Sequence, residues 1–318
     1  MIYAPGAKVL VVDDNDMNLK VASNLLRLCG IKPDGASSGP EAIELMEKYT
    51  YNIVFMDHMM PGMDGIETLN RLKEKSLIPE GTFVIALTAN AVVGAREMYL
   101  EAGFSDYLSK PMEIKYLVEK LKAYLPESAY EPNAGALISK ETDRFDGNVN
   151  NRDGADNEII EFEADEAEDI FEFSPEEDFD SENLETDSTN TLIDLEGLKN
   201  CGIDVNEGLR YCAGDESLYF EMLGDFAERC EKRVSELDHL YHDENWHDYE
   251  IAVHALKSSA RIIGADRLSE MAADMETAAD RGDLEYINAN TDALLKEYLS
   301  FKEKLSGLKE AADDSGKE

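Results

Sequence analysis

The chain has 318 residues, 69 of them acidic and 30 basic, and its formal net charge at pH 7 is −39. This length suits about two domains. Because nucleic acids and anionic membrane surfaces attract clusters of lysine and arginine, a chain this acidic is not expected to bind either of them.

Residues 8–125 alternate short apolar runs with amphipathic helical patterns. This alternation predicts a small doubly wound α/β domain with five strands. Helix ends are indicated by Gly30 and Gly103, and Pro40 suits the first turn of a helix after Ser38. We expect strands at Lys8–Val12, Lys32–Ala36, Ile53–Met56, Phe83–Leu87 and Asp106–Leu108.

Residues 126–190 lose this periodicity. They carry 22 acidic and 3 basic residues and are rich in Asn, Ser and Gly, a composition that cannot bury enough apolar surface to offset the entropy of ordering. We predict a disordered linker. Its segment from Ile159 to Phe179 mixes apolar and acidic residues, which fits either a solvated tether or a docking segment for a basic groove.

Residues 191–310 are helical in pattern throughout. Gly264 and Gly282 separate the predicted helices. Long helices joined by short turns favour an up-and-down four-helix bundle, followed by a disordered tail at 311–318. The predicted helices are Glu216–His242, Asn245–Ile263, Ala265–Arg281 and Asp283–Leu308, after a short helical entry at Leu195–Cys212.

Polar side chains follow the predicted strands of the first domain. Asp13 and Asp14 follow the first strand, Asp57 the third, Thr88 the fourth and Lys110 the fifth. Because the carboxyl ends of parallel strands line one crevice, we expect these side chains to converge. Singly, each residue has an ordinary interpretation as a polar loop, a surface charge or a helix cap, and only their combination indicates a site.

Three clustered carboxylates repel one another, so a hard cation such as Mg²⁺ is expected among them. In that setting Asp57 can attack a phosphoryl group as a carboxylate nucleophile and form an aspartyl phosphate. The cation, Lys110 and the Thr88 hydroxyl would then compensate the charge on the phosphoryl oxygens.

Four sequence blocks in this domain resemble the signatures of response regulator receiver domains. They are V-L-V-V-D-D-N from Val9, V-F-M-D-H-M-M-P-G-M-D-G from Val54, A-L-T-A-N from Ala86 and L-S-K-P from Leu108. The resemblance implies a flavodoxin-like sheet with strand order 2-1-3-4-5 and a cis peptide before Pro111. It further implies these roles: Asp57 as phosphoacceptor, Asp13, Asp14, Asp57 and the backbone carbonyl of Met59 as Mg²⁺ ligands, Thr88 and Lys110 as phosphoryl-binding residues, and Thr88 and Tyr107 as the switch pair.

A second candidate site is His254 in the helical region. At about 100° per residue, Lys257, Ser258 and Arg261 lie within about 60° of His254, and the apolar residues of this helix lie on the other side. We therefore expect an exposed imidazole on a polar, basic stripe. Such an imidazole can attack an aspartyl phosphate, and Lys257 and Arg261 can offset charge on the phosphoryl oxygens.

A lone helical histidine is more often structural than catalytic, and His239, His242 and His247 have no comparable neighbours. The run H-A-L-K-S-S-A-R-I-I-G-A from His254, however, resembles the motif of histidine phosphotransfer (HPt) domains. The resemblance extends over about residues 190–308, and Ser258 stands where glycine is common in that family.

Together the two resemblances imply a phosphorelay protein. An upstream sensor histidine kinase would phosphorylate Asp57, and His254 would relay the group to or from a partner receiver. The chain has no glycine-rich loop of an ATP-binding kinase, so any labelling of Asp57 would use a separate phosphodonor. Two alternatives remain open: a phosphorylation-dependent binding switch without onward transfer, and the C-terminal part of a bacterial hybrid histidine kinase.

The four cysteines, at 29, 201, 212 and 230, form no Cys-x-x-Cys pair, so we expect reduced, mostly buried thiols. Residues 1–8 lack a basic stretch followed by an apolar one, and no apolar run approaches the ~18 residues of a membrane span. We expect a cytoplasmic protein without membrane insertion.

Overall fold

The computed structural model describes residues 2–88, 95–130 and 195–314. They form a sheet domain and a helical domain, which belong to one compact unit. The segment at 159–179 and most of the predicted linker lie outside the described residues.

The sheet domain has five parallel strands in the order β2-β1-β3-β4-β5, which confirms the prediction. Three strands, β3, β4 and β5, end one residue later than predicted, so that Asp57 is the last residue of β3 and Thr88 the last of β4. Asp57 pairs in register with Leu87, the neighbour of Thr88. The side chains of Asp57 and Thr88 therefore lie at the same edge of the sheet. The strands are β1 Val9–Val12, β2 Asp34–Ala36, β3 Ile53–Asp57, β4 Phe83–Thr88 and β5 Asp106–Ser109.

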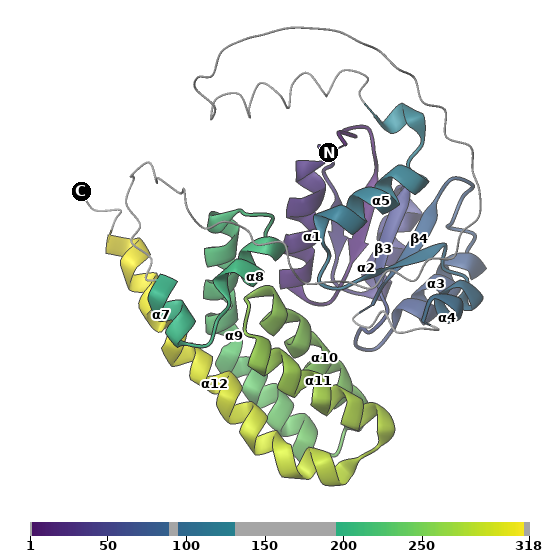
Figure 1. The fold of residues 1–318 in the computed structure, drawn as a ribbon. Helices are drawn as coiled ribbons and strands as arrows, with labels where there is room; N and C mark the ends of the chain where they lie inside the picture. Colours follow the sequence, from purple (N-terminus) through teal and green to yellow (C-terminus); the bar gives the residue numbers. More distant parts are fainter. Residues whose placement is uncertain (1, 89–94, 131–194, 315–318) are drawn as a thin grey trace, which may run out of the picture. The chain divides into compact units, whose positions relative to one another are not determined.

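Helices cover both faces of this sheet (Figure 1). Successive residues of β1 contribute to opposite faces: Val9 and Val11 pack with α1 and α5, and Leu10 and Val12 with α2, α3 and α4. This alternation follows from the period of two in a strand. The helices are α1 Asp16–Leu28, α2 Gly39–Lys48, α3 Gly65–Glu74, α4 Ala95–Ala102 and α5 Ile114–Tyr124.

Local capping explains where several of these helices begin. The side chain of Asn15 accepts a hydrogen bond from the Met17 N–H, and Ser38 Oγ accepts one from the Glu41 N–H. These bonds satisfy backbone donors that the first turn leaves free. Asn15 is thereby held at the start of α1, and its N–H donates to Asp13, the residue that directly follows β1.

The sheet domain continues past its predicted end at residue 125. The 3₁₀ helix η1, Glu127–Ala129, follows α5, and the buried Ala129 accepts a backbone hydrogen bond from Gly6 at 3.2 Å. The peptide between Lys110 and Pro111 is cis, as the resemblance implies.

The helical domain is a bundle of α9–α12 preceded by two short helices (Figure 1). Gly264 and Gly282 adopt the left-handed backbone conformation at the turns, where residues with a side chain are strained. The last helix extends to Asp314, so residues 311–314 of the predicted tail are helical. The helices are α7 Leu195–Asn200, α8 Val205–Tyr211, α9 Glu216–His242, α10 Trp246–Ile262, α11 Asp266–Arg281 and α12 Leu284–Asp314.

The four cysteines are free thiols; three of them are buried and Cys201 is partly exposed. Burial raises the pKa of Cys212 and of Cys230 to about 12, so these thiols are protonated and serve as small apolar groups. Within the described ranges, none of the helices has the length and apolar character that a membrane crossing requires.

Candidate functional site

Three carboxylates meet at the carboxyl edge of the sheet. Oxygen atoms of Asp13, Asp14 and Asp57 lie within 4.8 Å of one another. Asp13 and Asp57 are almost fully buried, with 0% and 1% exposure. Asp13 accepts two hydrogen bonds from Asn18 Nδ2, at 2.9 and 3.1 Å, and one from the Asn15 N–H at 3.0 Å, so its position is well defined.

Lys110 is the cation that faces this cluster. Its Nζ lies 2.7 Å from Asp57 Oδ2 and 3.4 Å from Asp13 Oδ2, and its side chain is 3% exposed. Although it is so close to Lys110, Asp57 Oδ2 makes no hydrogen bond of suitable geometry within the described residues. Its contact with Lys110 is thus an ion pair.

One ammonium does not balance three carboxylates. Burial raises the pKa of Asp57, and the charges of Asp13 and Asp14 add to the effect although Lys110 opposes it. Burial and the charge of Asp13 likewise raise the pKa of Asp14 to about 6. A divalent cation with oxygen ligands would offset the excess negative charge and keep Asp57 ionised, so the donor set fits Mg²⁺.

Three other predicted site residues lie on or just after β3, β4 and β5. Thr88 is 6% exposed at the end of β4. The backbone N–H of Met59 donates to Asp57 Oδ1 at 3.3 Å, while the ligand role of its carbonyl stays a prediction. Tyr107 is half-buried, with Lys120 Nζ 5.6 Å from the centre of its ring, and its switch role also stays a prediction.

Tyr99, a residue of α4, was not among the residues predicted from the sequence. Its hydroxyl lies 2.9 Å from His58 Nδ1 and also forms a hydrogen bond with the side chain of Thr88. Tyr99 is 2% exposed. A change at Thr88 can therefore be transmitted to α4 through this hydroxyl.

His254 is held by a carboxylate from the neighbouring helix. Its Nδ1 lies 2.6 Å from Oε1 of Glu276 on α11, and the other oxygen of Glu276 binds Lys257 Nζ. This places the imidazole proton on Nδ1, where it is donated to Glu276. The Nε2 atom then carries the lone pair, and among the described residues it has no hydrogen-bond partner.

The expectation of an exposed His254 is wrong, because the residue is 4% exposed. The angular argument correctly placed Lys257 on the same side of α10, but it did not consider what covers that side. Glu276 of α11 contacts one edge of the ring, and the sheet domain contacts the same helix one turn away, at Ser259.

Burial and the positive charge of Lys110 together lower the pKa of His254 to about 4, against the opposing effect of Glu276. Burial favours the neutral form of Glu276 as well, but the hydrogen bond from His254 and the charge of Lys257 outweigh it and lower its pKa. At neutral pH the site therefore holds a neutral imidazole beside a carboxylate and an ammonium. A neutral imidazole is the nucleophilic form.

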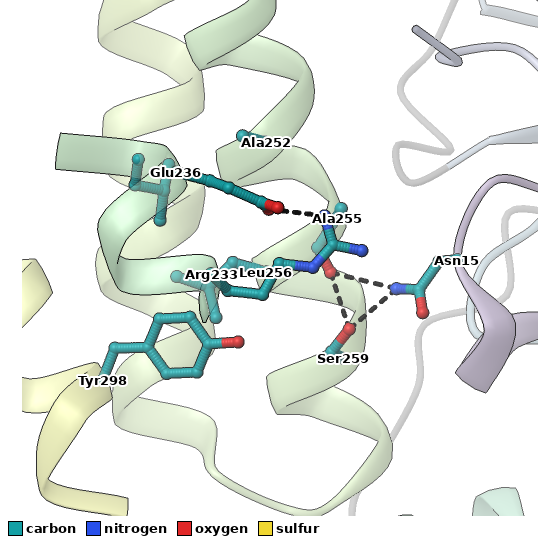
Figure 2. A pocket seen from close by; sticks show the side chains of 9 residues that line it. Asn15, Arg233, Glu236, Ala252, Ala255, Leu256, Ser259 and Tyr298 are labelled. Carbon is teal, nitrogen blue, oxygen red and sulfur yellow. Dashed lines mark hydrogen bonds and ion pairs between the residues drawn. The ribbon is translucent and has the colours of Figure 1, made fainter. Parts of the chain in front are cut away.

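Asn15 connects the two sites (Figure 2). Its Nδ2 donates to Ser259 Oγ at 2.7 Å and to the Ala255 carbonyl at 3.2 Å. Asn15 follows the acidic pair of the sheet domain, and Ala255 follows His254. The pocket around these contacts also contains Arg233 of α9, whose charge acts to lower the pKa of the neighbouring Asp14. The acidic cluster and the histidine thus lie on contacting faces.

The two domains belong to known families. Residues 9–122 match the response regulator receiver domain family, and residues 221–309 match the Hpt domain family. The chain therefore contains a receiver domain followed by an Hpt domain, which confirms both resemblances and defines the class of two-component signalling proteins.

Histidine kinases are among the relatives that the chain resembles. It is 39% identical over 123 residues to the signal transduction histidine-protein kinase BarA of Escherichia coli strain K12, a match that covers 38% of this chain and 13% of BarA. It is 35% identical over 129 residues to the hybrid signal transduction histidine kinase B of Dictyostelium discoideum, covering 37% of this chain and 7% of that protein. The matched part is thus a small fraction of these relatives.

One similar solved structure is the receiver domain of the sensor histidine kinase PA1611 from Pseudomonas aeruginosa PAO1, which has a magnesium ion coordinated in its active site cleft. It is 33% identical to this chain, and the match covers 37% of this chain and 97% of that domain with a TM-score of 0.34.

Proposed function

We propose that this chain is a phosphorelay protein. Asp57 accepts a phosphoryl group from a sensor histidine kinase, and His254 relays the group between Asp57 and a partner receiver. The observation that carries the proposal is that Asp57, whose Oδ2 is paired with Lys110 at 2.7 Å, and His254, whose Nε2 has no hydrogen-bond partner among the described residues, lie on contacting domain faces. A carboxylate oxygen of Asp57 and the lone pair of His254 Nε2 can each form a bond to phosphorus, and Lys110 lies where it can bind the phosphoryl oxygens.

The first step takes place in the receiver. Asp13, Asp14, Asp57 and the carbonyl of Met59 would hold Mg²⁺, which supplies positive charge to the phosphoryl oxygens. An oxygen of Asp57 attacks phosphorus, and the bond from phosphorus to the kinase nitrogen breaks. Lys110 and Thr88 bind the phosphoryl oxygens.

The second step takes place between the domains. The lone pair of His254 Nε2 attacks the phosphorus on Asp57, the phosphorus–oxygen bond breaks, and the carboxylate of Asp57 is restored. The imidazole gains positive charge in this step, and Glu276 stabilises it by accepting the hydrogen bond from Nδ1. Lys257 holds Glu276 in place. The reverse transfer uses the same groups.

The boundaries of the chain's parts are also proposals. We assign the receiver to about residues 1–130, five residues beyond the predicted end at 125, the remainder of the predicted linker to 131–190, and the Hpt domain to 191–310. A flexible linker of this length has a root-mean-square span of about 45 Å, which allows both domains of one chain to meet. The sensor kinase, the downstream receiver and a cytoplasmic location belong to the same proposal.

A second candidate function is a binding switch without onward transfer. The contact between Tyr99 and Thr88 favours it, because phosphorylation that moves Thr88 would change the environment of α4. In this alternative the phosphoryl group remains on Asp57 and the Hpt domain only docks a partner.

Labelling with acetyl phosphate and Mg²⁺, followed by mass spectrometry of both residues, separates the two functions. The relay requires label on Asp57 and then on His254. Asp57→Asn should abolish both labels. His254→Ala should leave label on Asp57 and block its transfer to an added receiver. Label that stays on Asp57 in the wild-type chain, even with receivers present, would establish the switch instead.

A further inference from the structure

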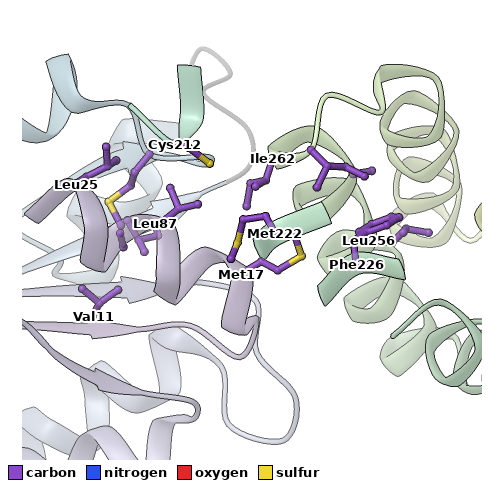
Figure 3. Close-up of a cluster of buried hydrophobic side chains, with 14 of the residues drawn as sticks. Val11, Met17, Leu25, Leu87, Cys212, Met222, Phe226, Leu256 and Ile262 are labelled. Carbon is purple, nitrogen blue, oxygen red and sulfur yellow. The ribbon is translucent and has the colours of Figure 1, made fainter. Parts of the chain in front are cut away.

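The receiver of this chain docks on its own Hpt domain through α1. A contiguous cluster of buried apolar side chains runs from the receiver core through Met17 and Val21 of α1 to Met222 and Ile262 of the bundle. Figure 3 shows Met17 beside Met222. Met17 is 2% exposed and Met222 is 0% exposed, so the contact has a dry apolar centre.

Oppositely charged side chains of α1 and α9 form ion pairs around this apolar centre. Lys20 Nζ lies 2.5 Å from Glu221 Oε1 and 2.5 Å from Asp225 Oδ2, and Arg229 Nη2 lies 2.9 Å from Asp16 Oδ2. On α1 the acid Asp16 precedes the base Lys20 by about one turn, and on α9 the acids Glu221 and Asp225 precede the base Arg229 by about two turns and one turn. The pairing therefore requires α1 and α9 to run in opposite directions in one register.

Further polar contacts fit the same register. Asn15, at the start of α1, donates to Ser259 of α10 at 2.7 Å. Asn24, about one turn after Lys20 towards the C-terminal end of α1, donates to the Cys212 carbonyl at 3.4 Å. The contact surface thus follows α1 from its first residue to its last turns.

Ion pairs of this kind select a partner more than they strengthen binding. The side chains of Lys20, Glu221 and Arg229 are 34%, 54% and 36% exposed, so water and salt screen their attraction. A receiver with an acidic residue in place of Lys20 would instead face two carboxylates. Such like-charge contacts disfavour the wrong partner.

We infer that the receiver-binding surface of the Hpt domain is matched to the receiver of this same chain, so that transfer between Asp57 and His254 is intramolecular. This inference rests on the proposed relay function and names the partner in one of its steps. Because His254 is 4% exposed in the docked arrangement, a second receiver can reach it only after the chain's own receiver has left.

The first test compares one chain with two. Full-length wild-type protein is labelled with acetyl phosphate and Mg²⁺, and label on His254 is followed at several protein concentrations. The same is done with a mixture of full-length Asp57→Asn and His254→Ala chains, in which transfer must occur between molecules. A tether gives an effective concentration of about a millimolar, so at micromolar protein we expect the mixture to be about 100-fold slower or more.

In the wild-type chain the first-order rate should not depend on protein concentration. A mixture that transfers as fast as the wild-type chain would overturn the inference and leave the relay function intact. Wild-type protein that carries label on Asp57 but never on His254 would overturn the relay function itself, and the inference with it.

The second test reverses the charges. Lys20→Glu should slow transfer from Asp57 to His254, measured relative to the label present on Asp57. Combining it with Glu221→Lys and Asp225→Lys should restore the rate, because opposite charges face each other again. Lys48→Glu, the same charge change on the exposed face of α2, is the matched control. A triple variant no faster than Lys20→Glu, or a control equally slow, would overturn the charge-matching argument.

Discussion

Replacing Glu276 with glutamine tests how the structure makes His254 a nucleophile. Glu276→Gln keeps the size of the side chain but removes the charge that binds both His254 Nδ1, at 2.6 Å, and the Lys257 ammonium. The amide nitrogen can also donate to Nδ1, which would move the imidazole proton to Nε2. That proton would block the lone pair that attacks phosphorus, so transfer to His254 should slow down.

The size of the effect follows from the hydrogen bond that is lost. The side chains of His254 and Glu276 are 5% and 17% exposed, so solvent replaces little of the interaction. A hydrogen bond to a charged group contributes about 1.5–3 kcal/mol. Because about 1.4 kcal/mol corresponds to a factor of ten in rate, we expect transfer to be about 10- to 150-fold slower.

The assay follows label from Asp57 to His254 in full-length protein after a pulse of acetyl phosphate, with the label on Asp57 measured in the same samples. Glu270→Gln is the matched control, because it makes the same chemical change at an exposed position of α11. A Glu276→Gln variant that transfers at the wild-type rate, while the control does so too, would refute the assigned role of Glu276.

Three further predictions concern the cation, the pH dependence and the packing around the phosphoacceptor. Asp13→Asn should raise the Mg²⁺ concentration needed for half-maximal labelling of Asp57 by about tenfold or more, because it removes a charged oxygen ligand; a Mg²⁺ titration of labelling checks this. Burial lowers the pKa of His254 to about 4, so the docked imidazole stays neutral at pH 5, where an exposed imidazole with its pKa near 6.5 takes up a proton. The contribution of His254 to the free energy of unfolding is therefore constant above about pH 7 and is about 2 kcal/mol smaller at pH 5. Acidification should for this reason lower the unfolding temperature more in the wild-type chain than in His254→Asn. Finally, a Cβ atom at Gly65 would lie 2.2 Å from the Asp57 carbonyl oxygen, and overpacking of this kind costs about 1–3 kcal/mol. Gly65→Ala should lower the midpoint of chemical denaturation, and Gly35→Ala, whose added Cβ has no atom within 4 Å, should not.

Much of the receiver could be predicted because its information is local in sequence. Apolar runs such as Ile53–Met56 mark buried strands, and a polar residue after such a run must lie at the carboxyl edge of a parallel sheet. The observed strand ends agree with the prediction to within two residues. The gathering of Asp13, Asp14, Asp57 and Lys110 therefore followed from pattern and topology together.

The histidine site was predicted less completely. The helical period correctly placed Lys257 on the same side of α10 as His254, but a period along one helix contains no information about the helix that packs against it. Glu276 looked like one more acidic residue in a very acidic chain. It became identifiable only when α11 brought its carboxylate to the imidazole.

The sequence by itself determined the two domain types, the sheet order and the acidic cluster, and it singled out the two residues that we propose as phosphoryl acceptors, because motif and periodicity are properties of neighbouring residues. Only the tertiary structure decided that His254 is buried and neutral, that Tyr99 contacts Thr88, and that Asn15 connects the two sites. These features depend on which surfaces pack together across more than 200 residues of chain. That packing depends on shape and charge complementarity between distant helices, which no local pattern contains.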